Sequence, residues 1–292
     1  WLKHALAAIC TMECSSGPEP ASKRARSNKT TTLFLVRHGD RWDYANRDSW
    51  ESITKEHGFE KRDPPLSALG HEQARCVAKA LGDQSIDCIL TSPYLRTIQT
   101  AQPLAHTTGL PICIEEGLAE CLHVVGSVAT PAHRFPYFPE VDIKYSQLHK
   151  ISPTDVDNQK KPMESFPTGY FRRMILMSQL LPQRFFGKSV VCFSHAASVA
   201  LVAALTGDSL FDTGTFAPAG IFKLVSQDGC SWIVEASGSD NSGHVTRNSL
   251  GTYPWGFIHV KELQGSTDED TKANIDSLLP KAKETFAGRA AL

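Results

Sequence analysis

The chain has 292 residues, of which 41% are hydrophobic and 21% are charged, and this composition is typical of a globular protein. The formal net charge is −1, so there is neither a basic field that would favour nucleic acid nor an acidic excess that would favour disorder. No apolar run approaches the roughly 20 residues that are needed to cross a bilayer, so we predict no membrane span.

Residues 1–30 are predicted to form a disordered tail. Positions 13–32 are rich in Ser, Pro, Lys, Arg and Thr and almost lack large apolar side chains. The chain begins with Trp1, and Met12 could be the natural start. The basic stretch 23–26 keeps a nuclear location open, although a solvated stretch is the simpler interpretation.

From residue 31 onward, strands and helices alternate. Short and almost continuously apolar runs predict strands that are covered on both faces, as in a parallel sheet. These runs are 33–37, 87–91, 111–115 and 189–194. Two later runs, 220–226 and 231–236, predict a pair of strands joined by a hairpin turn.

Helices are predicted between and after these strands, at 68–82, 93–107, 168–184 and 197–206. We expect Ser67 to cap the first helix, and Ser92 with Pro93 to open the second. The order of elements predicts an α/β protein, a three-layer α/β/α sandwich around a mainly parallel sheet, formed by residues 31–263.

Two regions depart from this alternation. Residues 122–167 carry Pro, His, Tyr and Phe without clean periodicity, and we interpret them as an inserted cap segment packed near the functional site. A surface excursion without a role remains the alternative. Residues 264–292 are predicted to form a solvated C-terminal extension with an amphipathic helix at 271–287.

The eight cysteines are scattered along the chain, and none of them forms a Cys-x-x-Cys pair. Several lie inside apolar runs. Buried free thiols in a reducing compartment are therefore a better interpretation than a zinc site or a disulfide framework. This cysteine usage predicts a cytoplasmic protein.

Three of the predicted strands end in side chains that suit a phosphate ester. Arg37 and His38 end the first strand, Arg96 lies in the helix that follows the second, and His195 ends the fourth. Carboxyl ends of parallel strands meet at one edge of the sheet, where ligands bind. Arg makes planar, bidentate contacts to phosphate oxygens, and His can act as a nucleophile. Glu120, after the third strand, supplies a carboxylate that could protonate a leaving oxygen.

These side chains lie in motifs that resemble those of the histidine phosphatase superfamily, also called the phosphoglycerate-mutase-like fold. The motifs follow the order of that family: Val36-Arg37-His38-Gly39, Pro65-Leu66-Ser67-Ala68-Leu69-Gly70, Ser92-Pro93-Tyr94-Leu95-Arg96-Thr97, Gly117-Leu118-Ala119-Glu120 and Phe193-Ser194-His195. Two details look most similar to the Sts-like and ecdysteroid-phosphate phosphatase branch: Gly39-Asp40-Arg41 and Asp63-Pro64-Pro65-Leu66-Ser67.

The resemblance implies a metal-independent phosphomonoester hydrolase that works through a phosphohistidine on His38. It implies that Glu120 is the general acid and then the general base, with Glu115 and Glu116 close enough in sequence to compete for that role. It implies no metal and no other cofactor. It also implies the residues that hold the phosphoryl group: Arg37, Arg41, Arg96 and His195.

Two alternatives stay open beside this interpretation. The first is a phosphoglycerate-type mutase, which is less favoured because Asp40-Arg41-Trp42-Asp43 replaces the Glu-Ser-x-Trp-Asn typical of mutases. The second is a non-catalytic phosphate-binding scaffold. The substrate would be a phosphorylated small molecule or a phosphopeptide, and neither its identity nor the oligomeric state can be read from the sequence.

Other side chains receive simpler interpretations. The remaining histidines are interpreted as structural. Four arginines are interpreted as surface charges: Arg62, Arg75, Arg172 and Arg173. Four aromatic residues are candidates for an apolar wall beside the site, or equally for ordinary core: Trp42, Phe135, Tyr137 and Phe138.

Overall fold

A computed structural model of the chain describes residues 30–58, 60–121, 130–151, 168–249 and 253–287. The predicted N-terminal tail, apart from residue 30, lies outside the described residues. So do two parts of the predicted cap segment, 122–129 and 152–167.

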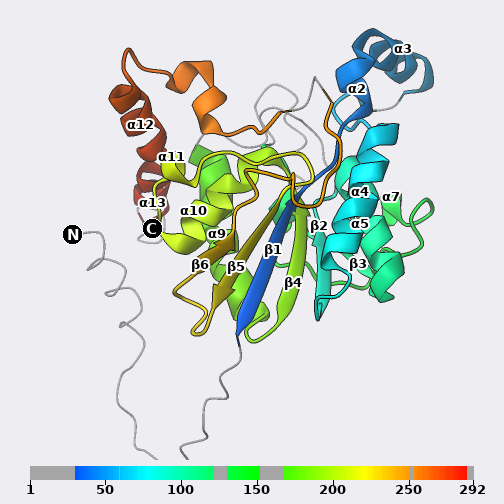
Figure 1. Cartoon of the computed structure of the whole chain (residues 1–292), viewed down its shortest axis with the longest axis horizontal. Coiled ribbons are helices and arrows are strands. Elements are labelled where there is room, and N and C mark those ends of the chain that lie inside the picture. The colour runs from blue at the N-terminus through cyan, green and yellow to red at the C-terminus, as the bar shows by residue number, and fades with distance from the viewer. Residues whose placement is uncertain (1–29, 59, 122–129, 152–167, 250–252, 288–292) are drawn as a thin grey trace, which may run out of the picture.

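A six-stranded sheet in the order β3-β2-β4-β1-β5-β6 occupies the centre of the molecule (Figure 1). Its strands are β1 (Thr31–Arg37), β2 (Cys88–Thr91), β3 (Ile112–Ile114), β4 (Ser189–Ser194), β5 (Ile221–Ser226) and β6 (Ile233–Ala236). The first four strands pair in parallel, while β5 runs antiparallel to β1 and β6 antiparallel to β5. The predicted, mainly parallel sheet is therefore confirmed.

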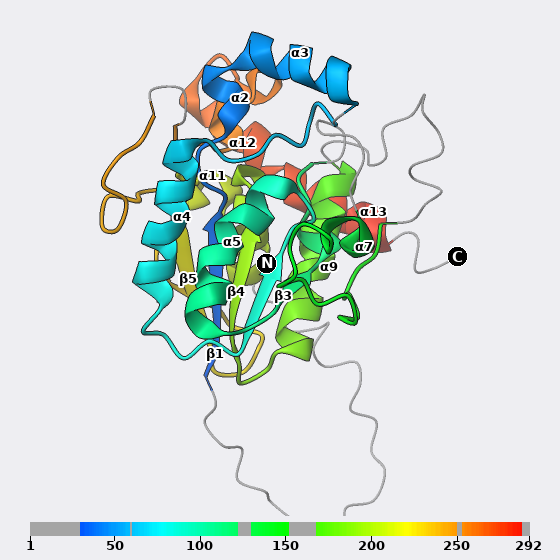
Figure 2. The same cartoon turned by 90° about the vertical axis from the view of Figure 1, so that its right-hand side faces the viewer.

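Helices cover both faces of this sheet, which confirms the three-layer sandwich (Figures 1 and 2). One face packs against α4 (Ala68–Leu81) and α5 (Leu95–Thr108), and the other against α9 (Thr168–Arg184) and α10 (Val199–Thr206).

Strand β1 shows why its sequence is apolar throughout. Phe34 and Val36 belong to the apolar cluster on the α4–α5 side, and Leu33 and Leu35 belong to the cluster on the α9–α10 side. Successive side chains of a strand point to opposite faces, so a strand covered on both faces needs apolar residues at every position.

Two helices that the sequence analysis did not predict follow β1 directly. They are α2 (Trp42–Ala45) and α3 (Arg47–His57), and both views place them beyond the carboxyl ends of the parallel strands (Figures 1 and 2). In α3 the buried residues are Trp50 and Thr54. The helix is short and mostly polar, with Trp50 and Ile53 as its large apolar side chains, so it does not stand out in the sequence. Two shorter helices were also not predicted: α7 (Pro131–Arg134) and α11 (Leu210–Thr213).

The described part of the predicted cap segment packs along the edge strand β3. Val141 forms an isolated parallel bridge with Ile112. Val141 and Phe138 are both buried in the apolar cluster on the α4–α5 side. Phe138 is therefore core rather than part of an apolar wall, whereas Tyr137 is 75% exposed.

The C-terminal region is part of the core, and its interpretation as a solvated extension is wrong. The chain forms two helices, α12 (Asp268–Asp276) and α13 (Leu278–Ala287), in place of the single predicted helix at 271–287. Ile275, Leu278 and Ala282 are buried in the cluster on the α9–α10 side. The predicted amphipathic pattern was real, but its apolar face is covered by the protein itself.

We expect Ile275→Ala to lower the free energy of unfolding by about 2–5 kcal/mol, because it leaves a cavity in a close-packed core. Urea denaturation measures this change. The matched control is Ile233→Ala, because Ile233 is 67% exposed and its replacement should change stability by no more than about 0.5 kcal/mol. Equal effects of the two substitutions would contradict the placement of α12.

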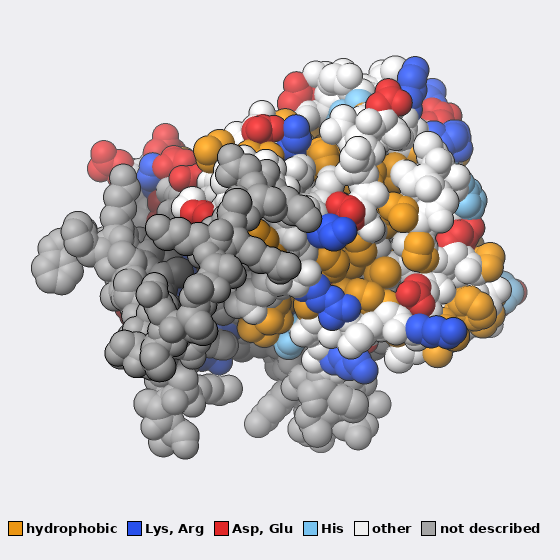
Figure 3. Space-filling model, turned by 90° about the horizontal axis from the view of Figure 1, so that it is seen from below, with side chains coloured by type: hydrophobic (Ala, Val, Ile, Leu, Met, Phe, Trp, Pro, Cys, Tyr) orange, Lys and Arg blue, Asp and Glu red, His pale blue; other side chains and the backbone are white. Residues whose placement is uncertain are grey.

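The surface carries charges of both signs. On the described part of the face seen from below, acidic and basic side chains are interspersed (Figure 3), in keeping with the formal net charge of −1. Within the described chain, no helix combines the length and the apolar character that crossing a membrane requires. Three of the cysteines among the described residues are buried: Cys113, Cys121 and Cys192.

Candidate active site

Two histidines meet where β1 and β4 end. The register of these strands pairs Arg37 with Ser194, and the backbone N–H of His38 donates to the carbonyl oxygen of Ser194 at 3.0 Å. His38 and His195 therefore follow neighbouring strands at the same level. Their ring centroids lie 5.4 Å apart, at an interplanar angle of 63°.

The imidazole of His38 is held in one tautomer. Its Nδ1 lies 2.7 Å from the carbonyl oxygen of Gly39. A carbonyl only accepts hydrogen bonds, so Nδ1 carries the proton and Nε2 keeps its lone pair. Burial lowers the pKa of His38 well below its usual value, and the charges of Arg96 and Arg37 lower it further. The ring is thus neutral, with its nucleophilic nitrogen at Nε2.

The turn after His38 is held by side chains from distant segments. A Cβ on Gly39 would meet the carbonyl oxygen of Gly70 at 2.7 Å, so only glycine permits this close approach. The carboxylate of Asp40 accepts from the hydroxyls of Ser67 at 2.6 Å and Ser249 at 2.7 Å. The Ser67 hydroxyl also accepts from the backbone N–H of Gly70 at 3.0 Å, which confirms the predicted cap of α4.

Arg96 links the second strand end to the two histidines. Its guanidinium is fully buried in the first turn of α5, and its Nη2 lies 3.1 Å from Nδ1 of His195. The Cζ of Arg96 also lies 4.7 Å from the ring centroid of Tyr94. Burial lowers the pKa of His195 well below its usual value, and Arg96 lowers it further. Like His38, His195 is therefore neutral.

Ser92 does not cap α5, contrary to the sequence prediction. Its hydroxyl lies 2.7 Å from Nε2 of His195, and the helix begins only at Leu95. The backbone N–H of Leu95 donates to the carboxylate of Asp63 at 2.7 Å, and Asp63 also pairs with Arg134 of α7. The capping carboxylate comes from a distant segment, so no local pattern could reveal it.

Arg37 and Arg96 each keep a buried hydrogen-bond donor that no described residue accepts. Nη1 of Arg37 donates to the carbonyl oxygens of Phe216 at 2.5 Å and Tyr253 at 2.9 Å. The buried Nε atoms of Arg37 and Arg96 have no hydrogen-bond partner among the described residues. A buried N–H without a partner costs free energy, and a phosphoryl oxygen is the kind of acceptor that would remove this cost.

Arg41 is already paired with a carboxylate. Its Nε and Nη2 donate to the two carboxylate oxygens of Asp43 at 3.0 and 2.7 Å, and Nη1 donates to the hydroxyl of Tyr44 at 3.3 Å. Its charge still acts on the site, since it contributes to lowering the pKa of His38 and of His195. A phosphoryl group would have to share this guanidinium with Asp43 or displace it.

Of the three glutamates considered as general acid, Glu120 is the one that lies beside the histidines. Its Oε2 is 3.7 Å from Nδ1 of His195, and its side chain is 18% exposed. The carboxylate of Glu115 instead accepts from the backbone N–H groups of Leu148 and His149 at 2.7 and 3.0 Å. Glu116 likewise faces the described part of the cap segment, where it accepts from Gln147 and Ile151.

Arg173 was interpreted as a surface charge, and this interpretation is wrong. It is 4% exposed and donates to backbone carbonyl oxygens of the loop that carries Glu120. Its sequence signal was its position among apolar residues of α9, where Phe171 and Met174 are fully buried.

The two buried neutral histidines should make stability depend on pH. Above about pH 6.5 the imidazoles are neutral both in the folded and in the unfolded chain. Below this pH the imidazoles become protonated in the unfolded chain but stay neutral in the folded one. The free energy of unfolding therefore falls as the pH falls, by about 1.4 kcal/mol per pH unit for each imidazole. Urea unfolding between pH 7.5 and 5.5 measures the slope.

His38→Asn is the matched variant for this prediction, because it keeps a polar side chain but cannot titrate. The slope of its free energy of unfolding against pH should correspond to about one proton fewer than in the wild type. The carboxylates that also titrate are common to both proteins and cancel in the comparison. Equal slopes would contradict a neutral His38.

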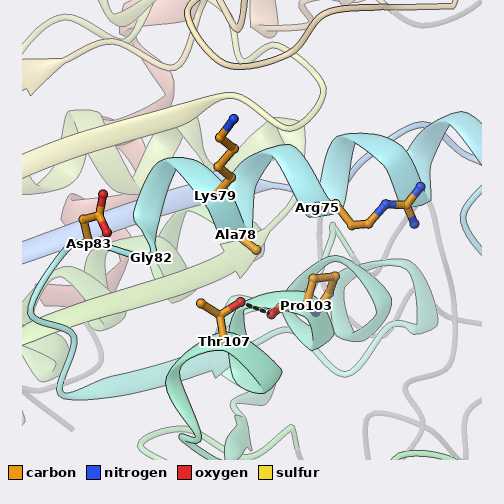
Figure 4. A pocket seen from close by; sticks show the side chains of 7 residues that line it. All are labelled: Arg75, Ala78, Lys79, Gly82, Asp83, Pro103 and Thr107. Atoms are coloured by element: carbon orange, nitrogen blue, oxygen red, sulfur yellow. Dashed lines mark hydrogen bonds between the residues drawn. The ribbon is translucent and has the colours of Figure 1, made fainter.

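A shallow groove of about 450 Å³ lies elsewhere, between α4 and α5 (Figure 4). It is lined by Arg75, Ala78, Lys79, Gly82, Asp83, Pro103 and Thr107. Neither histidine lines it, and neither do Arg37, Arg41, Arg96 or Glu120, so this groove is separate from the histidine pair. In the part of the chain that the structure describes, no group of three or more His, Cys, Asp or Glu side chains could hold a metal ion.

Comparison with known proteins gives the family. The model of the histidine phosphatase superfamily (branch 1) matches residues 33–236, which is most of the chain. The chain therefore belongs to the histidine phosphatase superfamily, as its motifs predicted. The match begins at β1 and ends at β6, so it covers the whole sheet and the residues gathered at its edge.

Individual relatives are more distant. The probable phosphoglycerate mutase GpmB of Photorhabdus laumondii subsp. laumondii is 38% identical over 93 residues, which are 32% of this chain and 38% of GpmB. The chain thus matches well under half the length of this curated relative. Phosphoserine phosphatase 1 of Hydrogenobacter thermophilus is 27% identical over 180 residues, 61% of this chain and 77% of that protein.

A solved structure has a similar fold. The ecdysone phosphate phosphatase from Bombix mori, in complex with tungstate, superposes with a TM-score of 0.58 at 19% sequence identity. The superposition covers 77% of this chain and 98% of that one. The likeness supports the α/β sandwich of this chain.

Proposed function

We propose that this protein is a metal-independent phosphomonoester hydrolase that works through a phosphohistidine on His38. The observation that carries the proposal is a buried, neutral imidazole with its lone pair on Nε2, beside two arginines that keep buried donors without a partner. Membership of the histidine phosphatase superfamily and the match to a phosphoserine phosphatase support it.

In the first step, Nε2 of His38 attacks the phosphorus atom while the bond to the leaving oxygen breaks. Glu120 gives its carboxyl proton to that oxygen, so the alcohol or phenol leaves neutral. The product is a phosphohistidine, and Glu120 is left as a carboxylate.

In the second step, water attacks the phosphorus atom of the phosphohistidine. The Glu120 carboxylate takes a proton from this water, and the N–P bond breaks with its electron pair returning to Nε2. Inorganic phosphate leaves and both residues return to their starting states.

Arg37, Arg96 and His195 stabilise the phosphoryl oxygens in both steps. Phosphoryl transfer is catalysed mainly by positioning and by charge stabilisation, and the buried guanidiniums of Arg37 and Arg96 supply both. Arg41 adds positive charge at the rim, within the pair that it forms with Asp43.

The substrate is proposed to be a phosphorylated small molecule or a phosphopeptide. A phosphoglycerate-type mutase is the second candidate, and the 38% identity to GpmB over 93 residues favours it. The Arg41–Asp43 pair counts against the mutase, because it replaces the motif that is typical of mutases. We also propose a cytoplasmic location on the ground of cysteine usage; microscopy of the tagged full-length protein tests it.

Rapid quench with a ³²P-labelled aryl phosphate tests the proposed function. We expect a burst of protein-bound phosphate that is stable in alkali and labile in acid, as a phosphohistidine is. A protein that binds phosphate but forms no such adduct would be a scaffold, and the proposal would fail. Phosphoryl exchange between phosphoglycerates that depends on a bisphosphate primer would instead establish the mutase.

A further inference from the structure

Arg173 of helix α9 forms three hydrogen bonds to the loop that carries Glu120. Nη1 of Arg173 donates to the carbonyl oxygens of Gly117 at 2.9 Å and Ala119 at 2.8 Å, and Nη2 donates to the carbonyl oxygen of Glu120 at 3.1 Å. The side chain is 4% exposed, and its Cζ lies 5.1 Å from the ring centroid of Tyr170.

These contacts leave the loop little freedom. The hydroxyl of Ser194, at the end of β4, donates to the carbonyl oxygen of Leu118 at 2.8 Å. The carbonyl oxygens of four successive residues, 117 to 120, are thus held from two elements of the core. The carbonyl of Glu120 is bonded to the same Cα that bears its side chain, so holding this carbonyl limits where the carboxylate can lie.

We propose that Arg173 is a positioning residue for the general acid, which holds the Glu120 carboxylate beside His195 by binding the backbone of its loop. This inference rests on the proposed function. Only a planar guanidinium presents several donors in a fixed fork, so lysine can replace the charge of Arg173 but not its three hydrogen bonds.

A displaced general acid has a characteristic kinetic signature. An alkyl phosphate needs a proton on its leaving oxygen, whereas p-nitrophenolate is stable enough to leave without one. Because kcat/KM reports only the steps up to departure of the leaving group, it isolates the step in which Glu120 acts as an acid. Misplacing a catalytic group by about 1 Å can cost about 10²-fold.

We test the proposal with Arg173→Lys on two substrates, β-glycerol phosphate and p-nitrophenyl phosphate. For β-glycerol phosphate, kcat/KM should fall by about 30- to 100-fold, and for p-nitrophenyl phosphate by no more than about threefold. Arg184→Lys is the matched control, since Arg184 is exposed at the other end of the same helix. It should leave both values unchanged.

A second variant and a double variant keep the test decisive. Arg173→Gln should show the same selective loss, and both Arg173 variants should bind tungstate as the wild type does. If Arg173 acts through Glu120, adding Arg173→Lys to Glu120→Gln should cause no further loss on β-glycerol phosphate. Equal losses on both substrates, no loss, or loss of tungstate binding in both variants would overturn the proposal.

The proposed function and this inference fail in different ways. If His38→Ala kept its turnover, the phosphohistidine mechanism itself would be wrong. If His38→Ala were inactive while Arg173→Lys lost activity equally on both substrates, only the positioning role would be wrong.

Discussion

Replacing His38 with alanine is expected to lower kcat/KM for p-nitrophenyl phosphate by at least about 10⁴-fold, because it removes the nucleophile of the proposed covalent intermediate. Among the described residues, the imidazole that lies beside His38 belongs to His195, whose Nδ1 faces Arg96 and whose Nε2 lies 2.7 Å from the Ser92 hydroxyl. With both nitrogens engaged, this ring is a poor substitute for the nucleophile. The rapid-quench adduct should disappear together with steady-state turnover.

The His38→Ala experiment needs a control for folding and a control for histidine loss. Tungstate titration supplies the first, because Arg37 and Arg96 remain and should still bind the anion. His71→Ala supplies the second, since His71 lies half-buried on α4 among none of the site residues. A His38→Ala protein that kept one hundredth of the wild-type rate would exclude His38 as the nucleophile.

Glu120→Gln is expected to lower kcat/KM for β-glycerol phosphate by about 10²- to 10⁴-fold, the range that general acid catalysis contributes. The amide fills the same space beside His195 but has no acidic proton to give. For p-nitrophenyl phosphate the loss in kcat/KM should be much smaller, about tenfold or less, because its leaving group needs little protonation. Phosphohistidine should then accumulate, since the amide cannot activate water in the second step.

The matched control for this variant is Glu116→Gln. It makes the same substitution four residues away, on a carboxylate that accepts from Gln147 and Ile151 rather than facing the histidines. It should leave both kcat/KM values within about twofold of the wild type. If Glu116→Gln had a larger effect than Glu120→Gln, the proposed assignment of Glu120 as the general acid would be wrong.

The strands were predictable because a strand that is buried on both faces has an unbroken apolar run in its sequence. Each run of β1, β2, β3 and β4 is apolar without alternation, and each appears within a residue or two of its predicted bounds. The helices α2 and α3 have no such run. They lie beyond the end of the sheet, they are short, and they carry few apolar side chains, so they do not stand out in the sequence.

The start of α5 shows a different limit. Ser92 with Pro93 has the local pattern of a helix start, but the serine hydroxyl contacts His195 and the cap comes from Asp63. A serine hydroxyl can bond either to the backbone of a helix start or to another side chain. The tertiary structure decides which partner lies beside it, and the residues next to Ser92 do not reveal the choice.

Local sequence was enough for the family and for the α/β sandwich, because apolar runs and strand-end motifs are properties of neighbouring residues. Long-range packing alone brings Glu120, rather than Glu115 or Glu116, to His195. It also buries Arg173 against the loop that carries Glu120. These outcomes depend on distances between segments far apart in the chain, and such distances exist only once the sheet has formed and the helices have packed on it.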